Sequence, residues 1–240
     1  MESSVTLGKI IEDGTAKLNI EMPTNAIEAF GVYFAFLEEK SKEINLTSIT
    51  GVEDVAQLHF LDSLAMLMVD SFDGKRVIDV GSGAGFPGLP IKIVIPTMEL
   101  TLLDATAKKV DFLRALSSEL GLETNCIHER AEEASQKEQF RGKFDIAISR
   151  AVARLNVLCE LCLPFVCIGG MFYGMKGIDS NDEIEEAQNA IVALGGKIES
   201  IVDYAIPETD IHHRIIGIKK TASTPDAYPR RFARISKSPL

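Results

Sequence analysis

The chain has 240 residues, of which 46% are hydrophobic and 25% are charged, and its formal net charge is −10. This length suits one large domain or one domain with a modest extension, and it suffices to bury a core without disulfides or metals. The composition excludes long disordered regions. The acidic balance excludes a polyanion that coats the whole surface, although it leaves room for a local basic patch.

The sequence predicts a cytoplasmic protein with no membrane partner. No apolar run approaches the ~18 residues of a membrane span. The first residues, MESSVTLGKIIEDG, carry acids where a secretory signal carries bases. Four cysteines suit a reducing compartment. Cys159 and Cys162 form a lone CxxC in an apolar run, and no second CxxC or HxxxH completes a zinc site, so we expect buried thiols and no metal.

Residues 1–72 predict a helical N-terminal leader packed on the core. Thr24 or Asn25 offers an N-cap for a first helix, whose apolar positions follow three-to-four spacing. A second helix is expected to start after Gly51, with two acids in its first turn. Its apolar stripe consists of Leu58, Leu61, Leu64 and Leu67.

Residues 73–220 predict an α/β domain, because short apolar or β-branched runs alternate with helical segments there. The runs are RVIDV, ELTLLD, NCIH, FDIAIS and GMFYGMKG. Such alternation is typical of βαβ units in a mostly parallel sheet. The later runs KIESIVDYAI and HHRIIGIKK have no helix between them and predict an antiparallel pair at the sheet edge. Residues 221–240 predict a basic C-terminal tail.

The stretch RVIDVGSGAGFPGLP places three glycines directly after the first of these strands. Gly81, Gly83 and Gly85 allow positive φ in a sharp strand-to-helix turn and close approach of a ligand to the backbone. Asp104 ends the next strand, 23 positions beyond Gly81, where a carboxylate grips the two hydroxyls of a ribose.

The loop also discriminates between cofactors. Phe86 stands where a dinucleotide fingerprint has its third glycine. Asp79, an acid beside the loop, suits a cationic amino-acid moiety better than a phosphate. The pattern therefore predicts binding of S-adenosylmethionine, which has an ammonium, a sulfonium and no phosphate. The alternative is a tight turn that binds no ligand.

Five stretches, in this order, resemble the bacterial glucose-inhibited division protein B family: VIDVGSGAGFPGLPIKIVIP, TLLDATAKKVDFLR, RAEE, FDIAISRAVA and YGMKG. NLTSIT and HFLDS in the leader and TPDAYPRR near the end extend the resemblance over nearly the whole chain. Members of that family are small-subunit ribosomal RNA guanine-N7 methyltransferases. The resemblance implies a Rossmann-like methyltransferase domain behind a helical leader, with S-adenosylmethionine as cofactor and 16S ribosomal RNA or the small ribosomal subunit as partner.

The resemblance also implies cofactor contacts outside the glycine loop. Phe86 would form an apolar wall, and Ala131 with Glu132 would meet the adenine edge after the third strand. Arg150, at the end of the fourth strand, would hold the methionine carboxylate or a phosphate. The alternative for Arg150 is a structural pair with a nearby acid.

The implied reaction requires no catalytic base. Guanine N7 carries no proton, so positioning and electrostatics are expected to supply the rate. The fourth strand ends in ISRAVA and lacks the Asp/Asn-Pro-Pro-aromatic turn of enzymes that methylate an exocyclic amine. It also lacks the cysteine nucleophile of enzymes that methylate a pyrimidine carbon. The catalytic residues are therefore left unknown.

Several basic residues are candidates for contact with RNA. His59 either touches RNA or is structural. The bases placed near phosphates are Arg154, Lys176, Arg230, Arg231, Arg234 and Lys237. The segment 219–240 holds six bases against one acid, Asp226, so it is locally positive on an acidic protein. The alternative for the tail is a solvated, disordered end.

Two other functions fit parts of the sequence. The residues expected to bind S-adenosylmethionine would also serve a methyltransferase that acts on small molecules, because a fold does not fix its substrate. A non-catalytic RNA-binding or assembly module could keep the pocket only as structure. The basic tail counts against the first alternative, and the intact set of loop glycines and acids counts against the second.

Overall fold

The computed structural model describes residues 2–150 and 153–240 and centres on a seven-stranded sheet with the order β3-β2-β1-β4-β5-β7-β6. The strands are β1 (Arg76–Val80), β2 (Glu99–Asp104), β3 (Thr124–His128), β4 (Phe144–Arg150), β5 (Val166–Gly177), β6 (Gly196–Ala205) and β7 (His212–Lys220). Strands β1 to β5 pair in parallel, and β7 runs antiparallel to both β5 and β6. The expected Rossmann-like sheet with an antiparallel edge is therefore confirmed.

Strand β5 departs from the sequence prediction, because it begins at Val166 and not at Gly170. Its register against β4 shifts between the pairs Phe144–Val166 and Ile146–Met171. The irregularity is possible because Gly169 adopts a φ of +90°, which L side chains rarely adopt.

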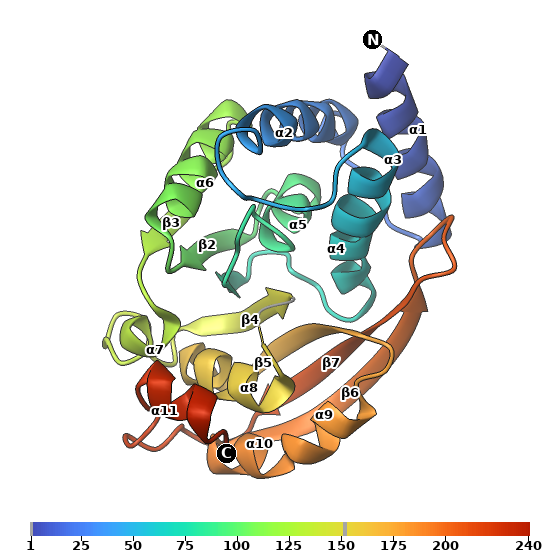
Figure 1. The fold of residues 1–240 in the computed structure, drawn as a ribbon. Coiled ribbons are helices and arrows are strands. Elements are labelled where there is room, and N and C mark those ends of the chain that lie inside the picture. The colour runs from blue at the N-terminus through green and yellow to red at the C-terminus, as the bar shows by residue number, and fades with distance from the viewer. Residues whose placement is uncertain (1, 151–152) are drawn as a thin grey trace.

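Helices cover both faces of the sheet (Figure 1). One face carries α1 (Glu2–Lys17), α2 (Ala26–Lys40), α5 (Gly88–Val94) and α6 (Ala107–Glu119). The other face carries α7 (Ala131–Ala134), α8 (Leu155–Cys162), α9 (Asn181–Glu186), α10 (Gln188–Ala193) and α11 (Phe232–Lys237), with a short 3-10 turn η3 (Leu163–Phe165) after α8. No helix of the described residues is long and apolar enough to cross a membrane.

The second predicted leader helix starts at Val52, as expected after Gly51, but it is not uniform. It consists of α3 (Val52–Val55), the π-helical turn η1 (Ala56–Leu61), α4 (Asp62–Leu64) and the 3-10 turn η2 (Ala65–Met68). The predicted leucine stripe is only half right, because Leu61 and Leu64 are fully buried whereas Leu58 and Leu67 are half-buried. A change of helical pitch rotates successive side chains away from a straight 3.6-residue stripe.

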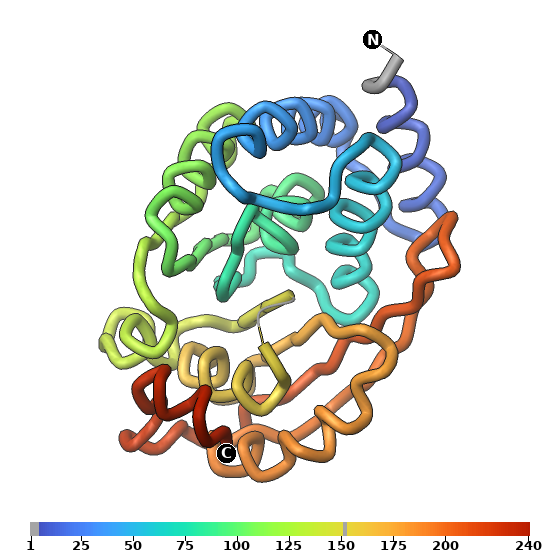
Figure 2. The backbone as a smooth tube through the Cα atoms, in the orientation of Figure 1, coloured from blue at the N-terminus to red at the C-terminus, as the bar shows by residue number. Residues whose placement is uncertain are grey.

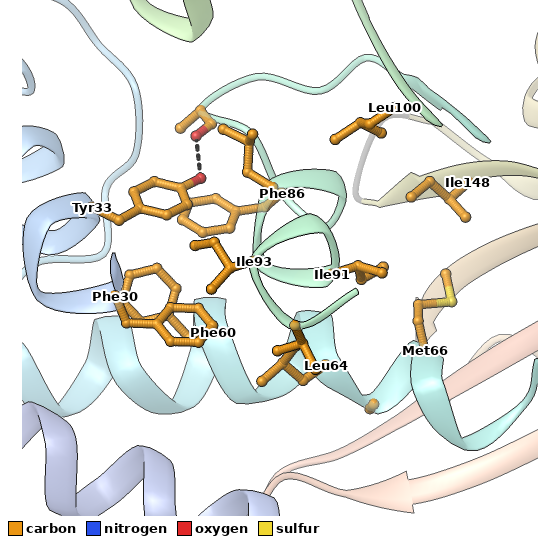
Figure 3. Packing of buried hydrophobic residues seen from close by; sticks show 14 of the residues in the cluster. Phe30, Tyr33, Phe60, Leu64, Met66, Phe86, Ile91, Ile93, Leu100 and Ile148 are labelled. Atoms are coloured by element: carbon orange, nitrogen blue, oxygen red, sulfur yellow. Dashed lines mark hydrogen bonds between the residues drawn. The ribbon is translucent and has the colours of Figure 1, made fainter. Parts of the chain in front are cut away.

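The leader shares a core with the parallel part of the sheet. Aromatic rings of α2, η1 and the glycine loop meet there: Tyr33 stacks on Phe86 at 5.2 Å between ring centroids, and Phe60 lies 4.9 Å from Phe30 (Figure 3). The Tyr33 hydroxyl donates a hydrogen bond of 2.6 Å to the Ala84 carbonyl. This contact connects the leader directly to the loop that follows β1.

A second core lies under α8 and α10 on the opposite face. Cys159 and Cys162 of α8 are both fully buried in it, and burial raises the pKa of each thiol. The prediction of buried core thiols is confirmed. Ile235 of the C-terminal helix α11 belongs to the same core and is completely buried.

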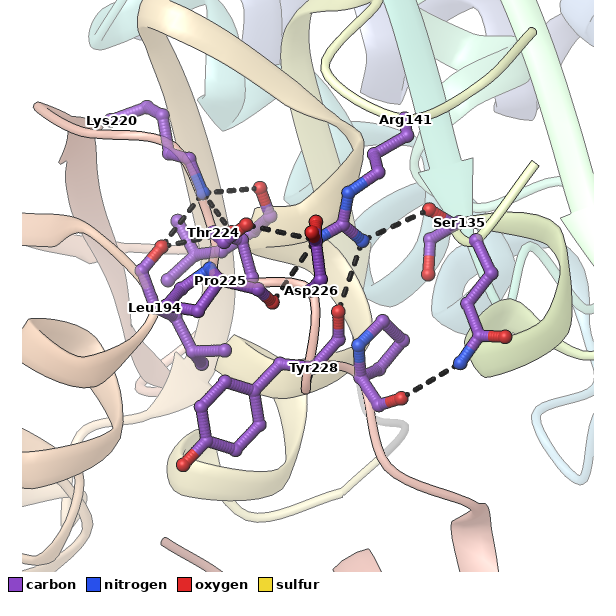
Figure 4. Close-up of polar contacts among 11 residues, drawn as sticks. Ser135, Arg141, Leu194, Lys220, Thr224, Pro225, Asp226 and Tyr228 are labelled. Carbon is purple, nitrogen blue, oxygen red and sulfur yellow. Dashed lines mark hydrogen bonds and ion pairs between the residues drawn. The ribbon is translucent and has the colours of Figure 1, made fainter. Parts of the chain in front are cut away.

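The C-terminal tail is folded against the domain, so the alternative of a solvated, disordered end is wrong. Figure 2 shows its red trace running beside the segment that contains α7 and α8. Arg141 donates hydrogen bonds to the carbonyls of Thr224, Pro225 and Tyr228, at 2.8, 3.1 and 3.0 Å (Figure 4). Gln136 donates to the Pro229 carbonyl at 3.0 Å. Ordered backbone acceptors of this kind tie the tail to the domain.

Candidate cofactor and substrate site

The loop between β1 and α5 has the backbone that its glycines predict. Gly81, Gly83 and Gly85 adopt φ of +76°, +59° and +100°. A Cβ added at Gly85 would lie 2.6 Å from both a Leu89 methyl carbon and the Tyr33 hydroxyl. The loop therefore requires glycine here for its dihedral angle and for its space.

Asp104 joins the end of β2 to this loop. Its Oδ2 accepts a hydrogen bond of 3.0 Å from the Gly83 amide, and its Oδ1 accepts one of 2.8 Å from the Thr106 amide. The side chain is nearly buried. Each carboxylate oxygen has more than one acceptor site, so both can still receive a ligand hydroxyl.

A cavity of about 410 Å³ lies against the loop. Its loop side is formed by Gly81, Ser82, Gly83, Ala84, Phe86, Asp104, Ala105 and Lys109, and its other side by Leu46, Thr47, His59 and Arg150. Six residues singled out in the sequence therefore meet around one cavity: Gly81, Gly83, Phe86, Asp104, Arg150 and His59. The fold brings them together because β1, β2 and β4 end at the same edge of the sheet.

Asp79 lies beneath the loop and is fully buried. Its Oδ2 accepts a hydrogen bond of 2.9 Å from the Gly88 amide at the start of α5, and its Oδ1 has no hydrogen-bond partner among the described residues. Burial raises the pKa of Asp79 to about 7, although the Gly88 hydrogen bond and the charge of Arg150 act in the opposite direction. Asp79 fixes the loop through Gly88 and is not among the residues that line the cavity, so its expected contact with a cationic ligand stays a prediction.

Ala131 and Glu132 begin α7, after β3, and Glu132 is almost buried. The Arg130 Nε donates a hydrogen bond of 2.9 Å to Glu132 Oε1. Glu132 lines a separate pocket of about 440 Å³ together with the tail residues Arg231 and Phe232. Glu132 therefore lines this pocket with the tail and is not among the residues that line the cavity beside the glycine loop.

Arg150 is the centre of a polar cluster at the end of β4. Its Nη1 donates to the Leu58 carbonyl at 2.9 Å and to Asp62 Oδ2 at 2.8 Å. Its Nη2 donates to His59 Nδ1 at 3.0 Å. The guanidinium also lies over the Phe86 ring, 5.1 Å from the centroid. The pairing with an acid that sequence reasoning left open is thus present, and it places Arg150 on the cavity wall.

His59 is held as a neutral ring. Because Arg150 donates to Nδ1, the ring proton lies on Nε2, which is 2.8 Å from the Thr47 hydroxyl. Burial, followed by the charge of Arg150, lowers the pKa of His59 to about 3. The ring stacks on Phe86 with 4.3 Å between centroids. A buried neutral imidazole is poorly suited to contact a phosphate, so we assign His59 to the structural alternative.

Asp62 links this cluster to the antiparallel edge of the sheet. Its Oδ1 accepts hydrogen bonds from the Tyr204 hydroxyl at 2.6 Å and from His213 Nδ1 at 2.8 Å. Burial by itself raises the pKa of Asp62, but the His213 hydrogen bond and the Arg150 charge hold that pKa below its ordinary value. Sequence reasoning missed this residue, although an acid inside the apolar run HFLDS was a visible signal.

A second cavity, of about 530 Å³, adjoins the first and shares His59 and Arg150 with it. The remaining lining residues are Ile49, Leu58, Asp62, Met175, Lys176, Gly177, Glu183, Ile211 and His213. Arg150 and His59 therefore form a partition between two adjacent cavities. One lies beside the glycine loop, and the other lies beside the last residues of β5 and the first residues of β7.

A family model described as "GidB: rRNA small subunit methyltransferase G" matches residues 26–212. The chain belongs to the GidB family. The Ribosomal RNA small subunit methyltransferase G of Alkaliphilus metalliredigens is 44% identical, over 96% of this chain and 98% of that protein. The proteins of the same name from Clostridium tetani and Acetivibrio thermocellus are 42% and 40% identical, with at least 96% of this chain covered. GidB membership confirms the resemblance and the expected methyltransferase class.

Solved structures support the fold. TYW2 of M. jannaschii, in complex with AdoMet, superposes with a TM-score of 0.52 at 12% identity, covering 70% of this chain and 80% of that one. The YcgJ protein of Bacillus subtilis gives a TM-score of 0.51 at 16% identity, covering 68% of this chain and all of that one. At such identities the likeness concerns the fold alone.

The predicted RNA-contacting bases of this GidB chain differ in their surroundings. Arg154 forms an exposed pair with Glu186 at 2.7 Å. Lys176 is nearly buried and pairs with Glu183 at 2.7 Å. Arg231 is exposed and has no ion-pair partner within residues 2–150 and 153–240.

Arg230 has an internal partner that sequence reasoning missed. Its Nη2 lies 2.6 Å from Oε2 of Glu160, which is fully buried in α8. Its Nε and backbone amide both donate to Oε1 of the same carboxylate at 2.8 Å. This guanidinium anchors the tail, and its placement counts against a direct phosphate contact.

Proposed function

We propose that the chain transfers a methyl group from S-adenosylmethionine to N7 of a guanosine in 16S ribosomal RNA, in the cytoplasm. The observation that carries the proposal is the cavity of about 410 Å³ in which the glycine loop and Asp104 face the Arg150 cluster, in a chain of the GidB family. The family supplies the reaction class, and the cavity supplies groups that suit this cofactor.

The residues present fit S-adenosylmethionine, which supplies an electrophilic methyl group on a sulfonium. Asp104 offers acceptors on both oxygens for the two ribose hydroxyls. Phe86 provides an aromatic wall. Arg150 has five N–H donors, of which three are engaged by Leu58, Asp62 and His59. The guanidinium therefore keeps donors for a ligand carboxylate while its position is already fixed.

We assign the adenine edge of the cofactor to Ala131 and Glu132. The register pairs Asp104 of β2 with His128 of β3, so α7 begins three residues beyond the position beside Asp104. An adenine next to the ribose held by Asp104 would then extend toward the first turn of α7. The amides of Glu133 and Ala134 already donate to the Arg130 carbonyl. The amides of Ala131 and Glu132 are therefore the ones that can donate to the ring.

The chain's residues position the reaction and transfer no proton. N7 is an unprotonated lone pair on the Hoogsteen edge of guanine, so an in-line approach is sufficient. His59 is unsuited to act as a base, because Arg150 occupies its Nδ1 and its Nε2 carries the proton toward Thr47. Arg150 and His59, which line both cavities, fix the orientation of what binds where the cavities meet.

Mass mapping of modified guanosines in small-subunit RNA tests the proposal. Cells that lack the gene should lose 7-methylguanosine at one position, and the wild-type gene should restore it. Asp104→Ala should fail to restore it, because cofactor binding depends on that carboxylate. Purified RNA and assembling subunits can then be compared as substrates. Unchanged methylation in cells without the gene would overturn the assignment.

A further inference from the structure

The second cavity has the size and the composition of a base-binding site. Its volume of about 530 Å³ lies in the usual range for small-ligand pockets. Its walls are apolar at Ile49, Leu58, Met175 and Ile211, and its polar groups include Lys176 and Glu183. It meets the cavity beside the glycine loop at the partition formed by Arg150 and His59. A flat ring bound there would present one edge to the cofactor cavity.

Glu183 is a fixed carboxylate on the wall of this cavity. Its Oε2 accepts a hydrogen bond of 2.9 Å from the Leu155 amide at the start of α8, and it pairs with Lys176 Nζ at 2.7 Å. No hydrogen bond engages its Oε1 in the described part of the chain. The carboxylate is therefore held in place by one oxygen and can accept from a ligand with the other.

Lys176 places donors beside that acceptor. Its ammonium has three N–H groups, and two of them are directed at Glu183 and at the Ala153 carbonyl. The side chain is nearly buried and lines the cavity. One donor therefore remains next to a free carboxylate oxygen, which gives the cavity a donor and an acceptor side by side.

In the orientation that directs N7 toward the partition, this pair of groups is complementary to guanine and not to adenine, because an adenine placed in that way would direct its N6 amine at the Lys176 donors. Guanine presents the O6 acceptor next to the N1–H and N2–H donors, whereas adenine presents an N6 amine next to an N1 acceptor. In guanine, O6 also lies between N1 and N7. Lys176 follows Met175, which pairs with Arg150 in the sheet. A base that directs O6 at Lys176 and its N1 edge at Glu183 therefore turns N7 away from Glu183, toward the partition.

We propose that the second cavity binds the target guanine and that Glu183 is the residue that selects guanine, by accepting hydrogen bonds from N1–H and the exocyclic amine. The inference rests on the proposed function. It assigns Lys176 to O6 of the base, in place of the phosphate contact expected from the sequence. Asp62, in the same cavity, is less suited to this role, because it already accepts three hydrogen bonds, from Arg150, Tyr204 and His213, whereas Glu183 keeps one oxygen with none among the described residues.

The test measures methylation of a guanosine-containing RNA and of the same RNA with inosine at the target position. Inosine keeps N7 and N1–H but lacks the exocyclic amine. Wild-type kcat/KM should fall about tenfold or more on this exchange, the loss expected for one hydrogen bond to a charged group. Glu183→Gln should lower kcat/KM for the guanosine RNA by a similar factor. In this variant, replacing guanosine with inosine should lower kcat/KM little further, because the mutation and the base exchange remove the same contact.

Two controls separate selection from folding. Affinity of Glu183→Gln for S-adenosylmethionine, measured by calorimetry, should equal that of the wild type. Glu186→Gln, on the same helix α9 but paired with the exposed Arg154, should keep the full preference for guanosine over inosine. Both variants keep a side chain of nearly the same shape.

The outcomes distinguish this inference from the function on which it rests. Wild-type protein that methylates RNA, with the same guanosine-to-inosine ratio in Glu183→Gln, would overturn the role of Glu183 alone. Loss of cofactor affinity in Glu183→Gln would overturn it as well, since the second cavity would then not be separate. Failure of the wild type to methylate RNA would overturn the proposed function and this inference with it.

Discussion

Arg150 and Arg230 lie on opposite faces of the sheet, and each holds a carboxylate that comes from a distant part of the chain. Arg150 pairs with Asp62 of the leader at 2.8 Å, and Arg230 pairs with Glu160 of α8 at 2.6 Å. Both side chains are mostly buried, and both carboxylates are almost completely buried. The same chemistry therefore joins distant segments in both regions.

The two regions differ in what surrounds the arginine and not in its free donors, since each guanidinium engages three of its five N–H groups. Arg150 lies on the wall of two cavities and keeps donors that no described residue engages. Arg230 directs its Nε and Nη2 at Glu160 and its Nη1 at the Ser238 carbonyl, 3.1 Å away. Arg230 also lines a pocket, of about 440 Å³, but its partners are a buried acid and the tail itself. A buried arginine pair therefore does not indicate a binding site by itself. At Arg150 the indication comes from the glycine loop and Asp104, which line the same cavity.

The largest expected effect is on stability, in the tail region. Glu160→Gln leaves the Arg230 charge without its buried partner, and such a loss costs about 3–5 kcal/mol of unfolding free energy. Chemical denaturation followed by circular dichroism measures it. Glu186→Gln, which breaks an exposed pair, should stay near the wild type. A stable Glu160→Gln protein would mean that Arg230 does not fasten the tail.

The next effect is the pH dependence of stability near Arg150, where Asp79 is buried within reach of the arginine's charge. The pKa of Asp79 is about 7 in the folded protein, against an ordinary value near 3.9. The stability that this group contributes is therefore full below about pH 4 and is lost as pH rises toward 7, by ~1.4 kcal/mol per pH unit. Between pH 5 and 7, the wild type should lose about 2–3 kcal/mol relative to Asp79→Asn. Parallel stability curves for the two proteins would contradict the raised pKa.

The third effect concerns the wall of the cofactor cavity that faces Arg150. Asp104→Ala removes acceptors for two ribose hydroxyls, and each hydrogen bond to a charged group contributes about 1.5–3 kcal/mol. Affinity for S-adenosylmethionine should fall at least about tenfold by calorimetry, whereas Glu160→Gln should bind it like the wild type. Unchanged affinity in Asp104→Ala would place the ribose elsewhere, and tight binding of NAD would contradict the choice of cofactor.

The smallest effect separates Arg231 from its neighbour Arg230. Arg231 is exposed and lacks an ion-pair partner among the described residues, so we expect it to contact phosphate. Arg231→Ala should weaken RNA binding modestly and flatten the plot of log affinity against log salt by ~0.7 for one single-strand contact. Its stability should remain that of the wild type. An unchanged salt slope would remove Arg231 from the RNA-binding surface.

Local patterns in the sequence predicted the parts of this molecule that depend on near neighbours. The alternation of runs gave the parallel sheet, and the spacing of Gly81, Gly83 and Gly85 gave a positive-φ loop followed by Asp104 one strand later. These features follow from backbone geometry over a few residues. They sufficed to indicate where the cavity that we propose for the cofactor lies.

Long-range partners were not predictable in the same way. Asp62 lies 88 positions before Arg150, and Glu160 lies 70 positions before Arg230, so topology alone decides that they meet. Sequence reasoning therefore assigned Arg230 to RNA from its charge, whereas the fold gives that charge to a buried acid. The buried orientation of Asp79 and the π-helical turn η1 also depend on packing that residue types do not reveal.

The comparison of the two arginines is tested most directly by single-turnover formation of 7-methylguanosine in small-subunit RNA. The measurement uses saturating S-adenosylmethionine and RNA, at a temperature where Asp62→Asn and Glu160→Gln are both folded. Asp62→Asn removes the charged partner of Arg150, while the contacts with Leu58 and His59 remain. The turnover should slow at least about tenfold, the factor for one hydrogen bond between charged groups. Glu160→Gln should react within about twofold of the wild type, since its effect lies in stability. Equal rates in the two variants, whether both fast or both slow, would contradict the division between a binding arginine and a fastening one.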